Sequence, residues 1–387
     1  NAPSALLSGR GAIYFGGKPK SEPFLAVHNQ ITYYTYASGD RNALTDDTLQ
    51  KLAPLVGLSV DTLRIQLRSD KKYKVIAKNI SKDNAIAVNA LKLTGVNAAA
   101  EITRNYVRGP LAAALLGFVG YKGNVRVGQY GIEGYHDALL SGEMTTQDIH
   151  GNKTFSDLYK LFSLRSKDTV LSEARTTVND SDGRGYDVVL SIDHDIQAYT
   201  EQTLTTLLHR WNAPAGQIIV QEPSSGEIIA LVTSPSYDPN NYAAYPLGHY
   251  IDPAVQDTFE PGSSFKPVTM AAAIDAGKVT PETTYEDTGE VVFGPSIIHN
   301  YNNKANGLQT MRQVLEHSLN TGVIFAENKL GDDSFLNYIV GFGFGQKTNI
   351  DLAGEVNGTI ANLYSGRKVN FATAAFGQGI AVTPIQL

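Results

Sequence analysis

The sequence contains no cysteine, no long hydrophobic run and no long run of charge of one sign. The absence of cysteine excludes disulfides, thiolate zinc sites and a cysteine nucleophile. The longest apolar run, residues 111–120, is too short for a membrane-spanning helix, which needs ~20 residues. No signal peptide is visible, and we expect any membrane anchor to lie before Asn1. The net charge of −6 and the scattered Lys and Arg argue against a nucleic-acid partner.

The composition is otherwise that of a globular protein, with 42% hydrophobic and 18% charged residues in a chain of 387. This length suggests two or three domains. A polar, glycine-containing stretch at residues 178–187 is typical of a linker. We therefore expect an N-terminal domain over residues 1–185 and a second domain over residues 186–387.

Strand-like and helical stretches alternate in the first domain. Thr45, followed by two acidic residues, predicts a capped helix that ends at Gly57, and a further helix begins near Ser59. The second domain opens with a buried strand and a helix, followed by a hairpin whose turn contains Pro223 and Gly226. The expected strands are residues 24–27, 31–36, 188–192, 216–221 and 227–233, and the expected helix is 195–208.

The stretch EPGSSFKP places a serine after a Pro-Gly turn and a lysine three residues later. Pro267 has no backbone donor and therefore belongs in the first turn of a helix, which predicts a helix start near Ser263 or Ser264. The following residues are apolar on nearly all sides up to the stop at Gly277, as in a buried helix. At a spacing of three, the side chains of Ser263 and Lys266 share one face.

This pair suits nucleophilic catalysis. A serine hydroxyl needs a base to take its proton, and a lysine can be that base when burial and positive potential lower its pKa. The helix N-terminus supplies such potential and free N–H groups for an oxyanion. The alternative is that Ser263 only caps the helix while Lys266 lies in solvent. A lysine that opens an apolar helix favours the catalytic interpretation.

A second motif lies about fifty residues later. Thr310 and Gln313 form a capping-box pattern before one short helix, and a further apolar helix is expected over residues 323–330. Ser318 and Asn320 fall at the break between the two helices, where their side chains can point into one cleft. S-x-x-K followed by S-x-N, completed by K-T-G, is the motif set of penicillin-binding proteins and class A β-lactamases.

With these motifs, the chain resembles the class B penicillin-binding proteins, which are monofunctional D,D-transpeptidases, almost from end to end. The resemblance implies an α+β fold: an N-terminal pedestal, or dimerisation-type, domain, then a transpeptidase domain of the serine β-lactamase-like type with an antiparallel sheet flanked by helices. The segments that carry the resemblance are GRGAIY (9–14), LLGFVG (115–120), GQYGIEGYHDALLSG (128–142), LSIDHDIQAYTE (190–201), EPSSGEIIALVTSPSYDPN (222–240), FEPGSSFKP (259–267) and FGQGIAVTPIQL (376–387).

Two features depart from the family pattern. After the pedestal opening, residues 15–17 read Phe-Gly-Gly where Asp-Arg is usual. No Lys-Thr-Gly occurs; the similar triplet at residues 365–367 precedes the GQGI segment, whereas the family's triplet follows it. We expect the third motif beyond Leu387, so that the transpeptidase domain is incomplete at its C-terminus. A chain without that strand lacks a carboxylate-binding site and one oxyanion N–H, and would be inactive for that reason.

The resemblance implies a role for each matching residue. Ser263 attacks the penultimate D-Ala of a stem peptide ending D-Ala-D-Ala, and Lys266 takes its proton. Ser318 relays a proton to the leaving D-alanine, and Asn320 holds Lys266 and the substrate backbone. No cofactor or metal is required. The implied ligands and partners are peptidoglycan stem peptides, β-lactams, a SEDS-type glycosyltransferase and proteins of division or elongation. The implied location is extracytoplasmic, on an N-terminal membrane anchor.

Three alternatives remain open from the sequence. A serine β-lactamase or D,D-carboxypeptidase shares the S-x-x-K chemistry but transfers the acyl group to water. A catalytically silent cell-wall scaffold would explain the missing third motif. A Ser-His-Asp hydrolase is opposed by the absence of G-x-S-x-G and of any histidine in a motif.

Overall fold

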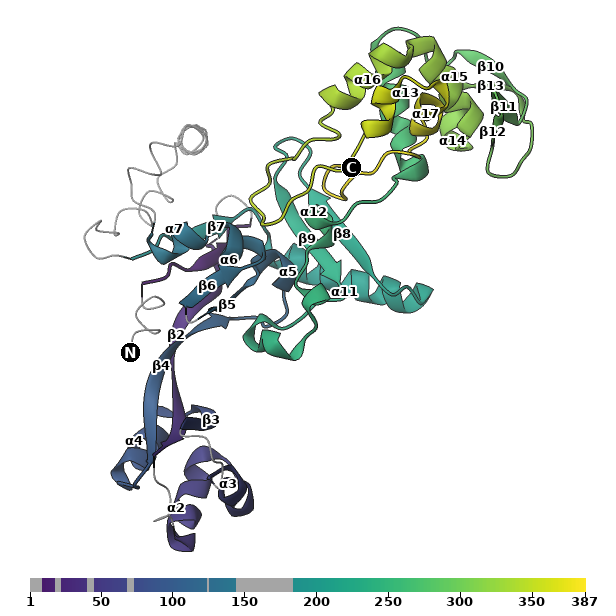
Figure 1. The fold of residues 1–387 in the computed structure, drawn as a ribbon. Helices are drawn as coiled ribbons and strands as arrows, with labels where there is room; N and C mark the ends of the chain where they lie inside the picture. The colour runs from purple at the N-terminus through teal and green to yellow at the C-terminus, as the bar shows by residue number, and fades with distance from the viewer. Residues whose placement is uncertain (1–8, 18–21, 40–44, 68–72, 124, 144–183) are drawn as a thin grey trace.

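The computed structural model describes residues 9–17, 22–39, 45–67, 73–123, 125–143 and 184–387. These residues form an elongated molecule, with a sheet-based N-terminal part and a C-terminal part rich in helices at the opposite end (Figure 1). Of the linker predicted at residues 178–187, residues 178–183 lie outside the described part.

The N-terminal sheet is built around one long strand, β2 (Phe24–Ser38). The sequence predicted two strands here, and the predicted gap between them is wrong. The polar residues His28, Asn29 and Gln30 continue the antiparallel pairing of β2 with β4 (Val96–Tyr106), so their backbone groups stay satisfied within the sheet. β1 (Ile13–Phe15) and β3 (Tyr73–Ile80) pair with the first and last parts of β2.

Helices cover the far end of this sheet. Thr45 caps the first helix through its side chain and Gly57 ends it in the left-handed conformation, which confirms the prediction for residues 45–57. Buried leucines of these helices pack on the sheet in a small separate core. The helices are α2 (Asp46–Val56), α3 (Val60–Leu67) and α4 (Lys82–Ala90).

The chain returns to the N-terminal sheet just before it enters the C-terminal part. β7 (Val188–Leu190) pairs in parallel with β1, with Val188 opposite Ile13. The strand predicted at residues 188–192 is present but ends at Leu190. The prediction that it is buried is wrong, because Val189 is exposed at the edge of the sheet. The strand belongs to the sheet of the N-terminal part although it lies beyond residue 185. The division at 185/186 stays a prediction.

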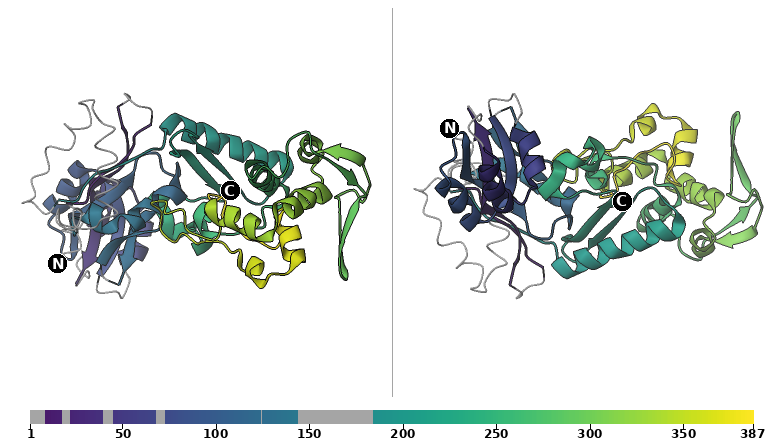
Figure 2. Two further views of the ribbon diagram at one scale, coloured as in Figure 1. Left: turned by 90° about the horizontal axis from the view of Figure 1, so that it is seen from above. Right: turned by 90° about the horizontal axis from the view of Figure 1, so that it is seen from below.

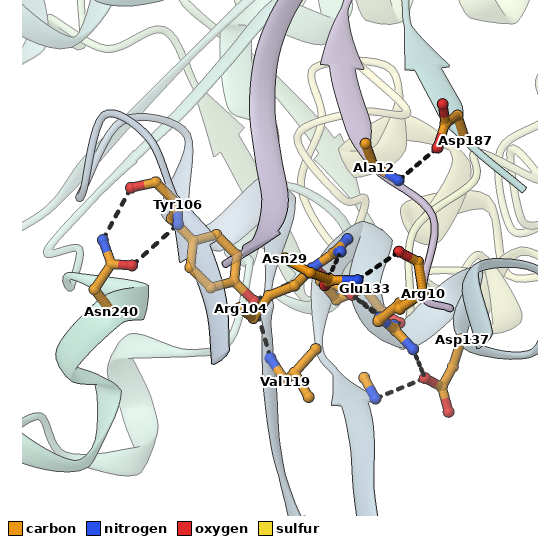
Figure 3. Close-up of polar contacts among 11 residues, drawn as sticks. Arg10, Ala12, Asn29, Arg104, Tyr106, Val119, Glu133, Asp137, Asp187 and Asn240 are labelled. Carbon is orange, nitrogen blue, oxygen red and sulfur yellow. Dashed lines mark hydrogen bonds and ion pairs between the residues drawn. The ribbon is translucent and has the colours of Figure 1, made fainter. Parts of the chain in front are cut away.

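A buried ion cluster joins two segments that the sequence singled out separately, GRGAIY and GQYGIEGYH. Glu133 is fully buried and accepts hydrogen bonds from Arg10 Nε at 2.8 Å and Arg104 Nε at 2.6 Å (Figure 3). Burial alone would raise the pKa of Glu133, but Arg104 and Arg10 outweigh it, so the pKa lies below its usual value. Asp137 accepts from Arg10 Nη1 at 2.7 Å. The elements around this cluster are α5 (Ala113–Leu116), β5 (Phe118–Lys122), β6 (Val125–Gln129), α6 (Gly131–Tyr135) and α7 (Asp137–Ser141).

The cluster lies beside the junction of the two parts. Asn240 of η1 (Pro239–Ala244) binds both the backbone N–H and the carbonyl of Tyr106, at 3.0 and 2.9 Å (Figure 3). One hydrophobic core contains side chains from both parts of the chain, including Phe118 and Tyr237, whose rings meet edge to face. The two parts are therefore packed together and not merely tethered.

The C-terminal part begins with α11 (His194–Trp211), capped by Asp193, and a hairpin of β8 (Gly216–Gln221) and β9 (Ile228–Ser234). The predicted helix and hairpin are confirmed. Two small two-stranded sheets extend from the far end of the molecule (Figure 2). They are formed by β10 (Thr284–Asp287) with β13 (Gly307–Thr310), and by β11 (Glu290–Phe293) with β12 (Ser296–His299).

A third core lies among the helices of the C-terminal part and contains Phe265, Met311 and Phe371. The helices around it are η3 (Gly262–Phe265), α13 (Lys266–Asp275), α14 (Met311–Glu316), α15 (Asn320–Leu330), α16 (Asp332–Gly341) and α17 (Lys368–Ala374). In the described part of the chain, no helix combines the length and the apolar character needed to cross a membrane.

Candidate active site

The serine of S-x-x-K lies in a tight turn directly before the buried helix. The turn, which we call the nucleophile turn, is the 3₁₀ segment η3, and α13 begins at Lys266. Helical structure therefore begins near Ser263 as predicted, but its first turn is a 3₁₀ turn and the α-helix itself follows. The Lys266 N–H donates to the Ser263 carbonyl, and residues three apart are eclipsed in a 3₁₀ turn, so both side chains leave the same side of the backbone. Ser263 is exposed.

Lys266 is buried, with 2% of the residue exposed, which excludes the alternative of a solvated lysine. Burial lowers the pKa of the Lys266 amine to about 8. At pH 7 about a tenth of such amines are neutral, compared with about one in a few thousand at the usual pKa of about 10.4. The amine donates to the Ser318 carbonyl oxygen at 2.6 Å and to Ser318 Oγ at 3.0 Å. S-x-x-K and S-x-N thus meet through one side chain.

The S-x-N motif lies at a break between helices, as predicted. Thr310 and Gln313 form the predicted capping box of α14. Ser318 follows α14 with a φ of 55°, a left-handed conformation that non-glycine residues seldom adopt. Such strain is common where a side chain is held for function. In this left-handed conformation, the carbonyl and the hydroxyl of Ser318 both reach Lys266.

Asn320 lies at the predicted break, but its side chain makes a different contact from the one that the resemblance implied. α15 begins at Asn320, three residues before the expected start at residue 323. Asn320 Nδ2 donates to the His299 carbonyl at 2.9 Å, and the hydrogen bonds of the described residues include none between Asn320 and Lys266. The Asn320 side chain thus binds the last residue of β12, and Ser318 makes the contact with the lysine.

The residues behind the nucleophile turn were not predicted from the sequence. Gly262 N donates to the Gly377 carbonyl at 3.0 Å, and both glycines have positive φ. A Cβ at Gly377 would lie 2.2 Å from the Gly262 carbonyl oxygen, so only glycine fits this contact. Gly379 N donates to Glu260 Oε1 at 2.9 Å. The two glycines of the FGQG segment were a signal for a close backbone approach.

The geometry provides an exposed hydroxyl, a buried amine of lowered pKa and a second hydroxyl on that amine. These are the parts of a nucleophile activated by a neighbouring base. Within the described residues, no group of His, Asp and Glu side chains is arranged to hold a metal ion.

Comparison with protein families gives two matches. The family described as penicillin binding protein transpeptidase domain matches residues 216–387. The family described as penicillin-binding protein dimerisation domain matches residues 8–162. The two matches lie in the order that the sequence analysis expected.

Individual relatives agree with the family matches. Stage V sporulation protein D of Bacillus subtilis is 31% identical over 351 residues, which are 88% of this chain and 51% of that protein. Peptidoglycan D,D-transpeptidase FtsI of Escherichia coli is 27% identical over 349 residues, or 88% of this chain and 55% of that protein. The chain spans about half the length of the curated relatives it matches.

A solved structure shows the same fold. Penicillin Binding Protein 2X from Streptococcus thermophilus superimposes with a TM-score of 0.70 at 20% identity, over 98% of this chain and 57% of that chain. With the dimerisation and transpeptidase domains both matched, in order, and relatives along most of its length, the chain belongs to the class B penicillin-binding proteins.

Proposed function

We propose that the protein is a peptidoglycan D,D-transpeptidase that works through an acyl-enzyme on Ser263. The observation that carries this proposal is the buried Lys266 amine, one 3₁₀ turn from Ser263 and bonded to Ser318. Two relatives support the same reaction: peptidoglycan D,D-transpeptidase FtsI of Escherichia coli, and the Neisseria meningitidis protein named "Probable peptidoglycan D,D-transpeptidase PenA".

In the acylation half-reaction, neutral Lys266 accepts the proton of the Ser263 hydroxyl. The Ser263 oxygen attacks the carbonyl of the penultimate D-Ala in a stem peptide ending D-Ala-D-Ala. The backbone N–H of Ser263 contributes one donor to the oxyanion that forms. As the C–N bond breaks, the proton passes from Lys266 through the Ser318 hydroxyl to the amino group of the leaving D-alanine, and Asn320 holds the substrate backbone.

In the second half-reaction, the amine of a neighbouring stem peptide attacks the ester carbonyl. Neutral Lys266 takes the proton that the attacking amine loses and passes it to the Ser263 oxygen as that oxygen leaves. The enzyme is thereby regenerated, and the cross-link is an amide. A β-lactam enters the same first step, because opening of its ring by Ser263 forms an ester that is hydrolysed slowly.

We also propose an extracytoplasmic location on an N-terminal membrane anchor, because peptidoglycan is cross-linked outside the cytoplasm. The proposed partners beyond the substrate are a SEDS-type glycosyltransferase and proteins of the division or elongation machinery. The family membership supports these assignments.

The test is the reaction of the full-length protein with benzylpenicillin, followed by peptide mass spectrometry. We expect one stable adduct on Ser263, no adduct in Ser263→Ala, and a normal adduct in Ser264→Ala. Ser264 is the matched control because it lies in the same turn and donates to the Pro261 carbonyl instead.

Two results would overturn the proposal. No adduct in the folded wild-type protein would favour a silent scaffold. An adduct that turns over rapidly to penicilloate would favour a β-lactamase. Release of D-alanine with formation of a new amide, measured on stem peptides with an added acceptor amine, separates the transpeptidase from a carboxypeptidase.

A further inference from the structure

A buried carboxylate lies behind the S-x-N motif, at the end of β10. Asp287 has 1% of its surface exposed. Burial alone would raise its pKa, but hydrogen bonds outweigh burial, so the pKa of Asp287 lies below its usual value and the side chain is ionised at neutral pH. The donors to its two oxygens are Gly289 N, Asn300 Nδ2, Asn306 N, Asn306 Nδ2 and Thr321 Oγ1.

Two of these donors, Asn300 and Thr321, also bind each other at the N-terminus of α15, where Asn300 caps the helix from outside it. The residue before α15, Leu319, has no side-chain cap. Asn300 Oδ1 takes that place, accepting from Thr321 N at 3.2 Å. A free N–H in the first turn of a helix is thus satisfied by a residue of a neighbouring hairpin.

The carboxylate sets the orientation of both capping groups. Asn300 Nδ2 donates to Asp287 at 3.0 Å, and therefore the oxygen of the Asn300 amide faces Thr321. The Thr321 hydroxyl has one proton, and the short 2.7 Å contact assigns it to Asp287. Tyr285 OH, 3.1 Å from Thr321 Oγ1, is then the donor to Thr321.

These contacts border directly on the candidate active site. His299 and Asn300 are consecutive, and they bind the consecutive residues Asn320 and Thr321. Three residues before Thr321 lies Ser318, which holds Lys266 and has a strained φ of 55°. A strained residue keeps its conformation only where the surrounding structure fixes it.

We propose that Asp287 is a positioning residue that acts through Thr321 and Asn300. It holds Ser318 in place against Lys266, and it holds Asn320 in place for the substrate. This inference rests on the proposed function. Asp287 itself touches no reacting group; its contribution is to fix the first turn of α15, on which the S-x-N side chains depend.

The test compares Thr321→Val with Thr321→Ser in the full-length protein. Valine keeps the shape but removes the donor to Asp287, whereas serine keeps the hydroxyl. Thr288→Val is the matched control, because exposed Thr288 directly follows Asp287 in the chain and its hydroxyl donates to the Glu290 carbonyl instead. Asp287→Asn is a second probe: every partner of Asp287 is a donor, so an amide NH₂ would face other donors.

Two measurements are made on each variant. One is the rate constant and the amplitude of acylation by benzylpenicillin. The other is the pKa of Lys266, followed by NMR with ¹³Cε-lysine and assigned with Lys266→Arg. The first reports the reaction and the second reports the Ser318 contact without any need for activity.

We expect Thr321→Val to lower the acylation rate constant about tenfold, through misplacement of Ser318 and Asn320, and to lower the Lys266 pKa, because the ammonium loses acceptors. Serine restores both values, and Thr288→Val changes neither. A purely structural role would lower the labelled amplitude and leave the rate constant and the pKa alone. An unchanged rate constant and an unchanged Lys266 pKa in Thr321→Val would overturn the inference. Absence of acylation in the wild type would instead refute the proposed function, and the Lys266 pKa would still test the positioning.

Discussion

The Lys266 amine donates to both the carbonyl and the hydroxyl oxygen of Ser318, at 2.6 and 3.0 Å. One buried nitrogen thus ties two sequence motifs that lie about fifty residues apart. The hydrogen bond to the Ser318 hydroxyl offers a path for a proton between the amine and that hydroxyl. The hydrogen bond to the Ser318 carbonyl holds the amine in position for this transfer.

Acylation should depend on the neutral form of Lys266. Because the pKa of the amine is lowered to about 8, the acylation rate constant should rise with pH, tenfold per unit well below pH 8, and level off above it. Stopped-flow measurements with a chromogenic β-lactam test this. Lys266→Arg should lose about 100-fold or more, since a guanidinium stays protonated. A flat profile between pH 6 and pH 9 would contradict the role of Lys266 as the base.

The same lysine should reduce stability. Its folded-state pKa lies below the unfolded value, so the charged form is penalised in the fold below pH 8, and the penalty disappears as pH rises from 8 to about 10.5. Lys266→Met should therefore raise the free energy of unfolding by about 2 kcal/mol at pH 7 and by little at pH 10.5. Urea titration followed by circular dichroism measures this, with the exposed Lys278→Met as control. Equal stability of Lys266→Met and wild type at pH 7 would count against a buried, strained amine.

The contact behind the nucleophile turn should not tolerate a side chain. Gly377→Ala would place a Cβ 2.2 Å from the Gly262 carbonyl oxygen, next to Ser263. We expect the acylation rate constant to fall at least about tenfold as the turn shifts. Gly366 also has a positive φ but has open space around its Cβ position, so Gly366→Ala controls for backbone strain alone. Similar losses in both variants would show that strain, and not the close approach, is responsible.

The ion cluster of the N-terminal part should be costly to break. Glu133→Gln leaves Arg10 and Arg104 buried with a neutral partner, and we expect a loss of about 3 kcal/mol or more in the free energy of unfolding. Asp47→Ala, which breaks an exposed pair with Lys51, should cost about 0.5 kcal/mol or less.

The pH dependence of this cluster has a definite sign. The folded-state pKa of Glu133 lies below the unfolded value, so its stabilisation is complete above the unfolded pKa and is lost as pH falls through the lower folded value. The difference between wild type and Glu133→Gln should therefore shrink on acidification. A difference that stays constant down to pH 3 would contradict this account.

Local sequence signals predicted most of the helices and turns. The Thr45 and Thr310 caps, the hairpin of β8 and β9, and the placing of Ser318 between helices all rest on contacts within a few residues. Such contacts can be read from the chain because the capping or turn residue lies beside the backbone group it satisfies.

The contacts that could not be predicted from the sequence are those between residues far apart in the chain. Nothing near Asn320 indicates that its amide binds the His299 carbonyl, and nothing near Asp287 indicates that it serves Thr321. The polar residues inside β2 look like a loop until β4 is placed beside them. Burial of Lys266 was predicted because its helix is apolar all round, which is a local property.

The parallel pairing of β7 with β1 has a consequence during synthesis. β1 can pair with β2 early, but because Val188 lies opposite Ile13, its second neighbour is missing until the ribosome has made nearly half of this chain. The strand that delays closure also leads directly into α11, so completion of the sheet and the start of the helical part coincide in time. If the chain were cut at residue 186, the C-terminal fragment would contain β7 and the N-terminal fragment would lose this edge strand. Unpaired backbone groups of β1 and β7 would then be exposed, and both fragments would tend to aggregate.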